Sequence, residues 1–244
     1  MFPIRDHNPS ERTPFVTYAL IAINVVIFLG QITLPEEELS QFLYTWGFVP
    51  GRVMEGYGFE TIFTSMFLHS GFMHIAGNML YLWIFGDNLE DELGHFGFLG
   101  FYIASGVAAA LAQALPDPYS GIPMVGASGA IAGVLGGYLL LFPKARIDVL
   151  FIFIIIFKVF PLPAWIVLGA WFGLQLLNSA SQLDAGVAYL AHAGGFVAGF
   201  VFILPKWLRE GGPAFWRRTH GHPPHPEARY DFVRSGVPTV KRRR

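Results

Sequence analysis

The chain has 244 residues, of which 53% are hydrophobic and 14% are charged, with a net charge of −1 and a mean hydropathy of +0.48. Soluble domains carry about 25% charged residues, so this composition excludes an ordinary soluble domain and predicts a polytopic membrane protein. Because there are no cysteines, disulfides, thiolate nucleophiles and cysteine-ligated zinc are also excluded.

The predicted elements are membrane-spanning helices. Six apolar stretches come close to the roughly 20 residues that cross a hydrocarbon core as a helix. They cover residues 15–34, 66–86, 96–115, 124–142, 162–179 and 187–205. We therefore predict an all-α fold, a bundle of six transmembrane helices, with three parts: an N-terminal tail (1–14), a membrane-embedded domain (15–207) and a basic, proline-rich, mobile tail (208–244).

A further apolar segment, Val149–Phe160, is too short to cross easily. A helix of these 12 residues would be about 18 Å long. The segment also carries Lys158 and is followed by Pro161 and Pro163. We interpret it as an interfacial or half-buried segment that stays on one side of the membrane.

The basic residues orient this topology, because Lys and Arg accumulate in cytoplasmic loops and tails. With six spans, 15 of the 16 Lys and Arg residues lie inside and only Arg52 lies outside. Both termini are then cytoplasmic. The first apolar run follows a polar tail and is long enough to remain as an anchor, so we expect no cleaved signal peptide. The expected location is a plasma membrane, specifically a bacterial inner membrane, because neither a long extra-membrane domain nor a transit-like N-terminus is present.

Polar residues inside the predicted spans are functional candidates, because polar groups are costly there. His74 and Asn78 are four residues apart, so both side chains lie on one helix face and can point donors at one spot. A hydrogen bond that only joins two helices would explain this pair equally well.

Ser128 lies in a glycine-rich turn, between Gly126 and Gly129, at the mouth of an apolar helix. His192 occupies a similar position at the start of the last span. Small residues at four-residue intervals predict close helix packing on both spans, and packing alone would also explain them. These residues are Gly129, Gly133 and Gly137 on one span and Gly195 and Gly199 on the other.

In the six-span topology His74, Ser128 and His192 all begin spans that follow outer loops, so they fall in the same leaflet. A seventh crossing by Val149–Phe160 would move His192 to the opposite face. If the residues meet, Ser128 can attack a carbonyl while His192 takes its proton, and donors from Asn78, His74 or the Ser128 amide can face the oxyanion. No Asp or Glu lies inside a predicted span, so the group that usually orients the base is missing.

Three segments resemble the rhomboid intramembrane serine proteases of the prokaryotic six-helix type. They are Thr64–Asn78 (TSMFLHSGFMHIAGN), Gly126–Gly129 (GASG) and Ala191–Gly195 (AHAGG), and their order across six spans is more specific than any one of them. The resemblance implies that Ser128 is the nucleophile, His192 the general base, and His74 with Asn78 the oxyanion donors.

The resemblance also implies a water-filled cavity open to the outer face, gated by residues 162–179 and 180–188. The substrates would be transmembrane helices of other proteins, cut near their outer ends. One departure concerns Ala132, because some members carry an aromatic residue there that packs on the catalytic histidine.

Two other functions remain open at this stage. His74, Asn78 and His192 could relay protons or hold a ligand in a transporter, or the chain could bind membrane helices without cleaving them. We expect no metal and no cofactor, and no nucleic-acid partner, since no helix carries a basic stripe. The sequence does not indicate an oligomeric state. Trp83, Trp165 and Trp171 are expected to contact lipid or to anchor their helices at the membrane interface.

Overall fold

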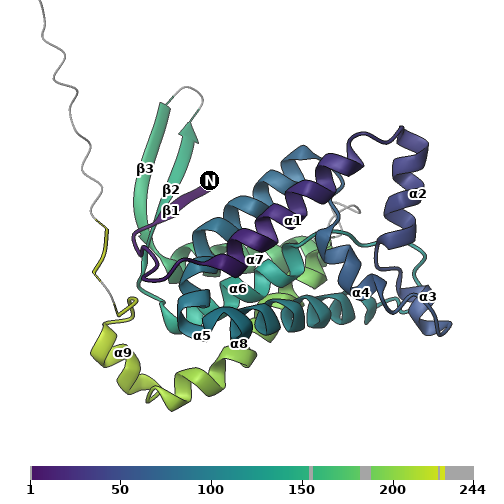
Figure 1. The fold of residues 1–244 in the computed structure, drawn as a ribbon. Coiled ribbons are helices and arrows are strands. Elements are labelled where there is room, and N and C mark those ends of the chain that lie inside the picture. Colours follow the sequence, from purple (N-terminus) through teal and green to yellow (C-terminus); the bar gives the residue numbers. More distant parts are fainter. Residues whose placement is uncertain (1, 154–155, 182–187, 225, 229–244) are drawn as a thin grey trace, which may run out of the picture.

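The computed structural model describes residues 2–153, 156–181, 188–224 and 226–228, and the chain is mostly helical (Figure 1). The helices are α1 (Phe15–Gln31), α2 (Glu36–Trp46), α3 (Pro50–Met54), α4 (Thr61–Thr64), the 3-10 turn η1 (Ser65–Phe67), α5 (Phe72–Ala114), α6 (Ser128–Leu141), α7 (Ala164–Ser181), α8 (Tyr189–Arg209) and α9 (Pro213–Thr219). The strands are β1 (Phe2–Asp6), β2 (Arg146–Phe153) and β3 (Ile156–Pro163).

Each of the six apolar stretches overlaps a helix, although several begin or end outside it. Among the described residues, α5 and α8 are long and apolar enough to cross a membrane, while α1, α6 and α7 are shorter apolar helices. The long helix α5 consists of two arms that meet at Gly94, where φ is +68°. Glycine adopts this backbone conformation without steric cost, so the chain can turn there. Both arms line one cavity, which shows that they run side by side.

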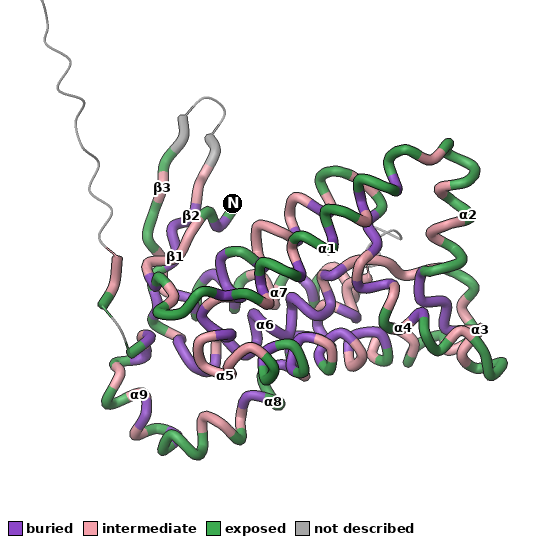
Figure 2. Tube along the Cα trace, viewed as in Figure 1, coloured by how far each residue is buried: buried purple, intermediate pink, exposed green. Residues whose placement is uncertain are grey.

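Helix α6 forms the centre of the bundle, with the other long helices packed around it (Figure 2). Twelve of its 14 residues are buried. Its sequence is apolar on every side, as expected for a helix enclosed by others. Two of its aromatic neighbours, Phe85 and Phe142, pack edge-on against Tyr138.

The structure corrects the all-α prediction at Val149–Phe160. The described residues of this segment belong to the antiparallel hairpin of β2 and β3, and β1 adds a third strand, in the order β1-β2-β3. Ile, Val and Phe dominate its sequence, and these residues favour strands. The fold is therefore not strictly all-α.

The hairpin returns the chain to the end of the bundle that it left. Ala164 at the start of α7 donates its amide to the Ala145 carbonyl at 2.8 Å, and Trp165 donates to Pro143 at 2.9 Å. Because α7 starts beside the end of α6, the segment does not add a crossing. This placement is the one that the meeting of Ser128 and His192 requires.

The N-terminal segment, which we expected to be a tail outside the membrane-embedded domain, is held by a buried polar cluster. The Tyr138 hydroxyl donates to the Asp6 carboxylate at 3.0 Å, and the Asn88 side-chain amide donates to the same oxygen at 3.0 Å. Asn8 donates to the Tyr138 oxygen at 2.8 Å. Burial, followed by repulsion from Asp87, raises the pKa of Asp6 from 3.8 to about 7.

This pKa predicts a pH-dependent contribution to stability. Folding favours the protonated form of Asp6, so its contribution is complete below pH 3.8 and is lost as the pH rises towards about 7. Asp6→Asn keeps the acceptor oxygen and cannot ionise. We expect the variant to melt higher than the wild type by at least about 3 °C near pH 8, where about 1 kcal/mol corresponds to 2–4 °C. Near pH 5 the difference should be smaller, and an equal difference at both pH values would contradict the prediction.

Part of the C-terminal segment is also packed rather than mobile. Helix α9 buries Phe215 against the bundle, and the Trp216 indole donates to the Leu140 carbonyl at 2.8 Å. The Lys144 amide donates to the Gly221 carbonyl at 2.9 Å. The prediction of a mobile tail from residue 208 therefore does not hold for this stretch, and residues 229–244 lie outside the described residues.

Candidate active site

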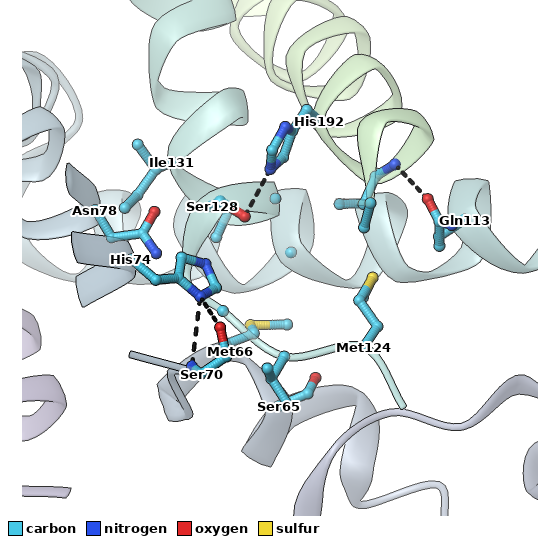
Figure 3. A pocket seen from close by; sticks show the side chains of 18 of the residues that line it. Ser65, Met66, Ser70, His74, Asn78, Gln113, Met124, Ser128, Ile131 and His192 are labelled. Atoms are coloured by element: carbon cyan, nitrogen blue, oxygen red, sulfur yellow. Dashed lines mark hydrogen bonds between the residues drawn. The ribbon is translucent and has the colours of Figure 1, made fainter. Parts of the chain in front are cut away.

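The first residues of three apolar helices meet at one cavity of about 830 Å³ (Figure 3). His74 comes from the first turn of α5, Ser128 is the first residue of α6, and His192 lies in the first turn of α8. The helices thus begin at the same end of the bundle, as the topology predicted.

Ser128 and His192 form a direct hydrogen bond although they are 64 residues apart in the chain. The Ser128 Oγ lies 2.8 Å from His192 Nε2. Ser128 Oγ also borders the cavity, so a bound carbonyl group can approach it. A hydroxyl at this distance from an imidazole nitrogen can transfer its proton as it attacks, which is the geometry of an activated nucleophile.

The turn before Ser128 is fixed from two sides. Gly126 donates its amide to the Ser65 carbonyl at 2.8 Å, and Met124 forms a pair of backbone hydrogen bonds with Phe48, at 2.8 and 2.9 Å. Gly126 has φ +127°, and a Cβ there would lie 2.8 Å from His74 Nε2. The position therefore requires glycine for its backbone and for the space beside His74.

His74 and Asn78 both line the cavity on the side facing Ser128 (Figure 3). The Ser70 hydroxyl lies 3.0 Å from His74 Nδ1, and the Ser70 amide, which can only donate, lies 3.5 Å from the same atom. These contacts favour a lone pair on Nδ1 and the proton on Nε2. The Asn78 side chain is 7% exposed, and its Nδ2 has no hydrogen-bond partner within the described structure.

A third group of donors comes from the helix itself. The first four amides of an α-helix have no partner inside it, and Ser128 begins α6. Ser128, His74 and Asn78 all line the cavity, so the Ser128 amide, the Asn78 Nδ2 and the His74 Nε2 are candidate donors to a group bound there. Such a set of donors can stabilise a negatively charged oxygen.

The glycines of α6 and α8 lie where the two backbones touch. A Cβ on Gly195 would overlap the Gly129 carbonyl, and a Cβ on Gly199 would overlap the backbone of Gly133. Gly137 instead faces side chains of α5, with Leu89 and Phe101 each 3.0 Å from a Cβ built there. Gly136, which the four-residue interval did not select, lies against the Phe196 carbonyl of α8.

Two residues of α7 in contact with His192 were missed from the sequence. Gln175 Oε1 lies 2.9 Å from His192 Nδ1, and the Trp171 ring lies 5.9 Å from the imidazole at an interplanar angle of 35°. Trp171 was expected to contact lipid, but it is half-buried. A search for any polar residue in the apolar helices, rather than for carboxylates, would have found Gln175. Residues 182–187, most of the expected gate loop, lie outside the described residues.

Gln113 fixes the start of α8. Its Oε1 accepts a hydrogen bond from the Ala191 amide at 3.0 Å, immediately before His192 (Figure 3). Because the first amides of a helix lack internal partners, this side chain supplies one from α5.

The structure thus belongs to the class of apolar helical bundles, with a hydrogen-bonded serine and histidine at a cavity between its helices. A model of the Rhomboid domain matches residues 57–209, which is more than half of the chain, so the chain belongs to the rhomboid family. Members of this family are multi-pass membrane proteins, and the family includes intramembrane serine proteases.

Individual relatives extend this match. The chain is 34% identical over 202 residues to Rhomboid protein 1, mitochondrial, of Saccharomyces cerevisiae, covering 77% of this chain and 52% of that protein. It is 28% identical over 205 residues to Rhomboid protease GluP of Bacillus subtilis, covering 84% of this chain and 37% of that protein. RHOMBOID-like protein 5 of Arabidopsis thaliana is 37% identical over 78 residues, 32% of this chain and 25% of that protein. The chain thus spans about half or less of the length of these relatives.

Proposed function

We propose that the chain is a serine endopeptidase that cleaves transmembrane helices of other membrane proteins near their outer ends. The observation that carries this proposal is the hydrogen bond between Ser128 Oγ and His192 Nε2 at the cavity, in a chain of the rhomboid family. A transporter or a passive binding protein has no need for a hydroxyl positioned against a base.

In the proposed reaction Ser128 Oγ attacks the scissile carbonyl carbon while its proton moves to His192 Nε2. The carbonyl oxygen becomes an oxyanion, and it accepts hydrogen bonds from Asn78, His74 and the Ser128 amide. When the C–N bond breaks, His192 gives the proton to the leaving amine and an acyl-enzyme remains. Water then attacks this ester while His192 accepts its proton. When the acyl bond breaks, His192 returns the proton to Ser128 Oγ and the free acid is released.

The membrane placement belongs to the same proposal. With the two arms of α5 counted separately, α1, α5, α6, α7 and α8 supply six crossings, both termini lie inside, and the cavity opens outwards. The cavity would admit the water that hydrocarbon excludes. Segments of a substrate helix with glycine or helix-breaking residues would unwind into it most readily. A bacterial inner membrane is the proposed location.

The experiment is cleavage in reconstituted vesicles. Purified full-length protein is mixed with a tagged single-span substrate whose outer half contains glycine and alanine, with chelator present throughout. Fragments are mapped by mass spectrometry, and a fluorophosphonate probe is used to find the reactive serine. We expect cleavage within the outer half of the span and probe attached to Ser128. Probe on another serine, or no cleavage across several such substrates, would favour the binding or transport function.

Loss of an oxyanion donor should lower the rate without preventing substrate binding. Asn78→Ala removes a buried donor that has no partner among the described residues, so in the proposed reaction its hydrogen bond forms when the oxyanion appears. We expect kcat to fall by about 10²- to 10³-fold with KM within about threefold of wild type. Parallel measurement of KM and thermal unfolding is the check. A variant that raised KM but kept kcat would show that Asn78 binds substrate instead.

A further inference from the structure

We infer that Gln175 and Trp171 of α7 position His192, in the place of the carboxylate and the aromatic residue that the sequence lacks. The inference rests on the proposed function, in which His192 acts as the general base. Neither residue would touch the substrate's reacting atoms, so both are positioning residues.

The hydrogen bond to Gln175 selects the useful tautomer of His192. A general base must present a lone pair at Nε2 to the Ser128 hydroxyl, so the ring proton must be on Nδ1. Gln175 Oε1 lies 2.9 Å from Nδ1 and can only accept, which holds the proton there. Gln175 is 9% exposed, so little water competes for this hydrogen bond.

The aromatic contact fixes the plane of the same ring. Trp171 lies four residues before Gln175, so the two side chains project from one face of α7. The Trp171 ring packs on His192 at 5.9 Å and also on Phe196 of α8 at 6.1 Å. Ala132 is fully buried and is too small to provide such a surface. The contact that the sequence lacks at residue 132 is thus replaced from a different helix.

An amide suits this site better than a carboxylate because His192 lies at the start of an apolar helix and is only partly exposed. A buried carboxylate would carry a large desolvation cost, whereas a neutral amide oxygen orients the ring at lower cost. When His192 gains the serine proton, the Oε1 dipole still faces the positive charge. The arrangement therefore serves both states of the base.

The test compares Gln175→Leu, Gln175→Glu and Leu29→Ala in the full-length enzyme. Leu29 lies on α1, away from the cavity, and is 54% exposed, so its variant is the control and should cleave as the wild type does. Gln175→Leu should lower kcat by roughly 10- to 100-fold, the range seen when a hydrogen bond that orients a functional histidine is removed. KM should stay within about twofold, since binding contacts are unchanged.

The pH profile separates positioning from a merely structural role. In Gln175→Glu a carboxylate beside the ring stabilises the imidazolium, so the acidic limb of kcat/KM should move up by about one pH unit or more. A residue that only supports the fold would lower activity without moving this limb. Wild-type kcat in Gln175→Leu, or an unmoved limb in Gln175→Glu, would overturn the inference.

A readout that needs no cleavage distinguishes this inference from the proposed function. In protein with ¹⁵N-labelled histidine, the signals of His192 are identified by their loss in His192→Asn. We expect the proton on Nδ1 in the Ser128→Ala background and its redistribution to Nε2 when Gln175→Leu is added. That result in a chain that cleaves no substrate would reject the protease and retain the positioning role. Unchanged ring signals in Gln175→Leu would reject the positioning role alone.

Discussion

Ser128→Ala is expected to slow cleavage of a single-span substrate by at least about 10⁴-fold, and His192→Ala by a similar factor. The hydroxyl is the attacking group, and without the imidazole 2.8 Å away it remains protonated and weakly nucleophilic. The measurement is the initial rate of fragment formation in vesicles, with chelator present. Ser128→Ala removes one atom that borders the cavity, so its unfolding temperature should change little. His192→Ala should melt somewhat lower, because it leaves the buried Gln175 oxygen without this donor.

The double variant provides the sharper test of a shared step. If the two residues act as one unit, Ser128→Ala combined with His192→Ala should be no slower than the slower single variant. If the rate losses of the two single variants multiplied in the double variant, Ser128 and His192 would act in different steps. Cleavage by Ser128→Ala above about 1% of the wild-type rate would identify a different nucleophile or a contaminating protease.

The residues of the candidate site could be predicted because the order of the membrane spans determines which helix ends lie together. His74, Ser128 and His192 are scattered over more than 100 residues, but each begins a helix after an outer loop, so counting spans brings them together. The same reasoning required Val149–Phe160 to stay on one side. The all-α prediction was wrong there, because length and hydropathy do not distinguish a short buried helix from a hairpin of β-branched and aromatic residues.

The residues that surround His192 were not predictable in the same way. Gln175 and Trp171 are 17 and 21 positions before His192, on a helix whose rotation no sequence pattern determines. A tryptophan in an apolar helix is typical of a lipid contact. Only the structure shows that Trp171 instead packs against His192 and Phe196. The cluster of Asp6, Asn8 and Asn88 was missed for a similar reason, since Asp6 and Asn88 are 82 positions apart in the chain and meet only in the folded structure.

A substitution where the backbones of α6 and α8 touch is expected to have the second large effect. The atoms in contact there belong to the backbone, so no side chain can move aside to make room. Gly199→Ala places a methyl group against the Gly133 carbonyl and Cα, so α8 must move away from α6 along its length. We expect the free energy of unfolding to fall by about 3 kcal/mol, the upper end for overpacking. For a chain of this size, this corresponds to a lower melting temperature by roughly 6–12 °C.

The same displacement should also impair the site, since Gly195, one turn before Gly199, contacts the Gly129 backbone beside Ser128. A longer distance between Ser128 and His192 would lower kcat even at temperatures where Gly199→Ala is folded. The matched control is Gly100→Ala in α5, where a Cβ meets nothing within 4 Å. Alanine should be neutral or stabilising by up to about 1 kcal/mol there, because it restricts the unfolded chain. If Gly199→Ala and Gly100→Ala had the same melting temperature, the backbones of α6 and α8 would have to lie farther apart than in the structure.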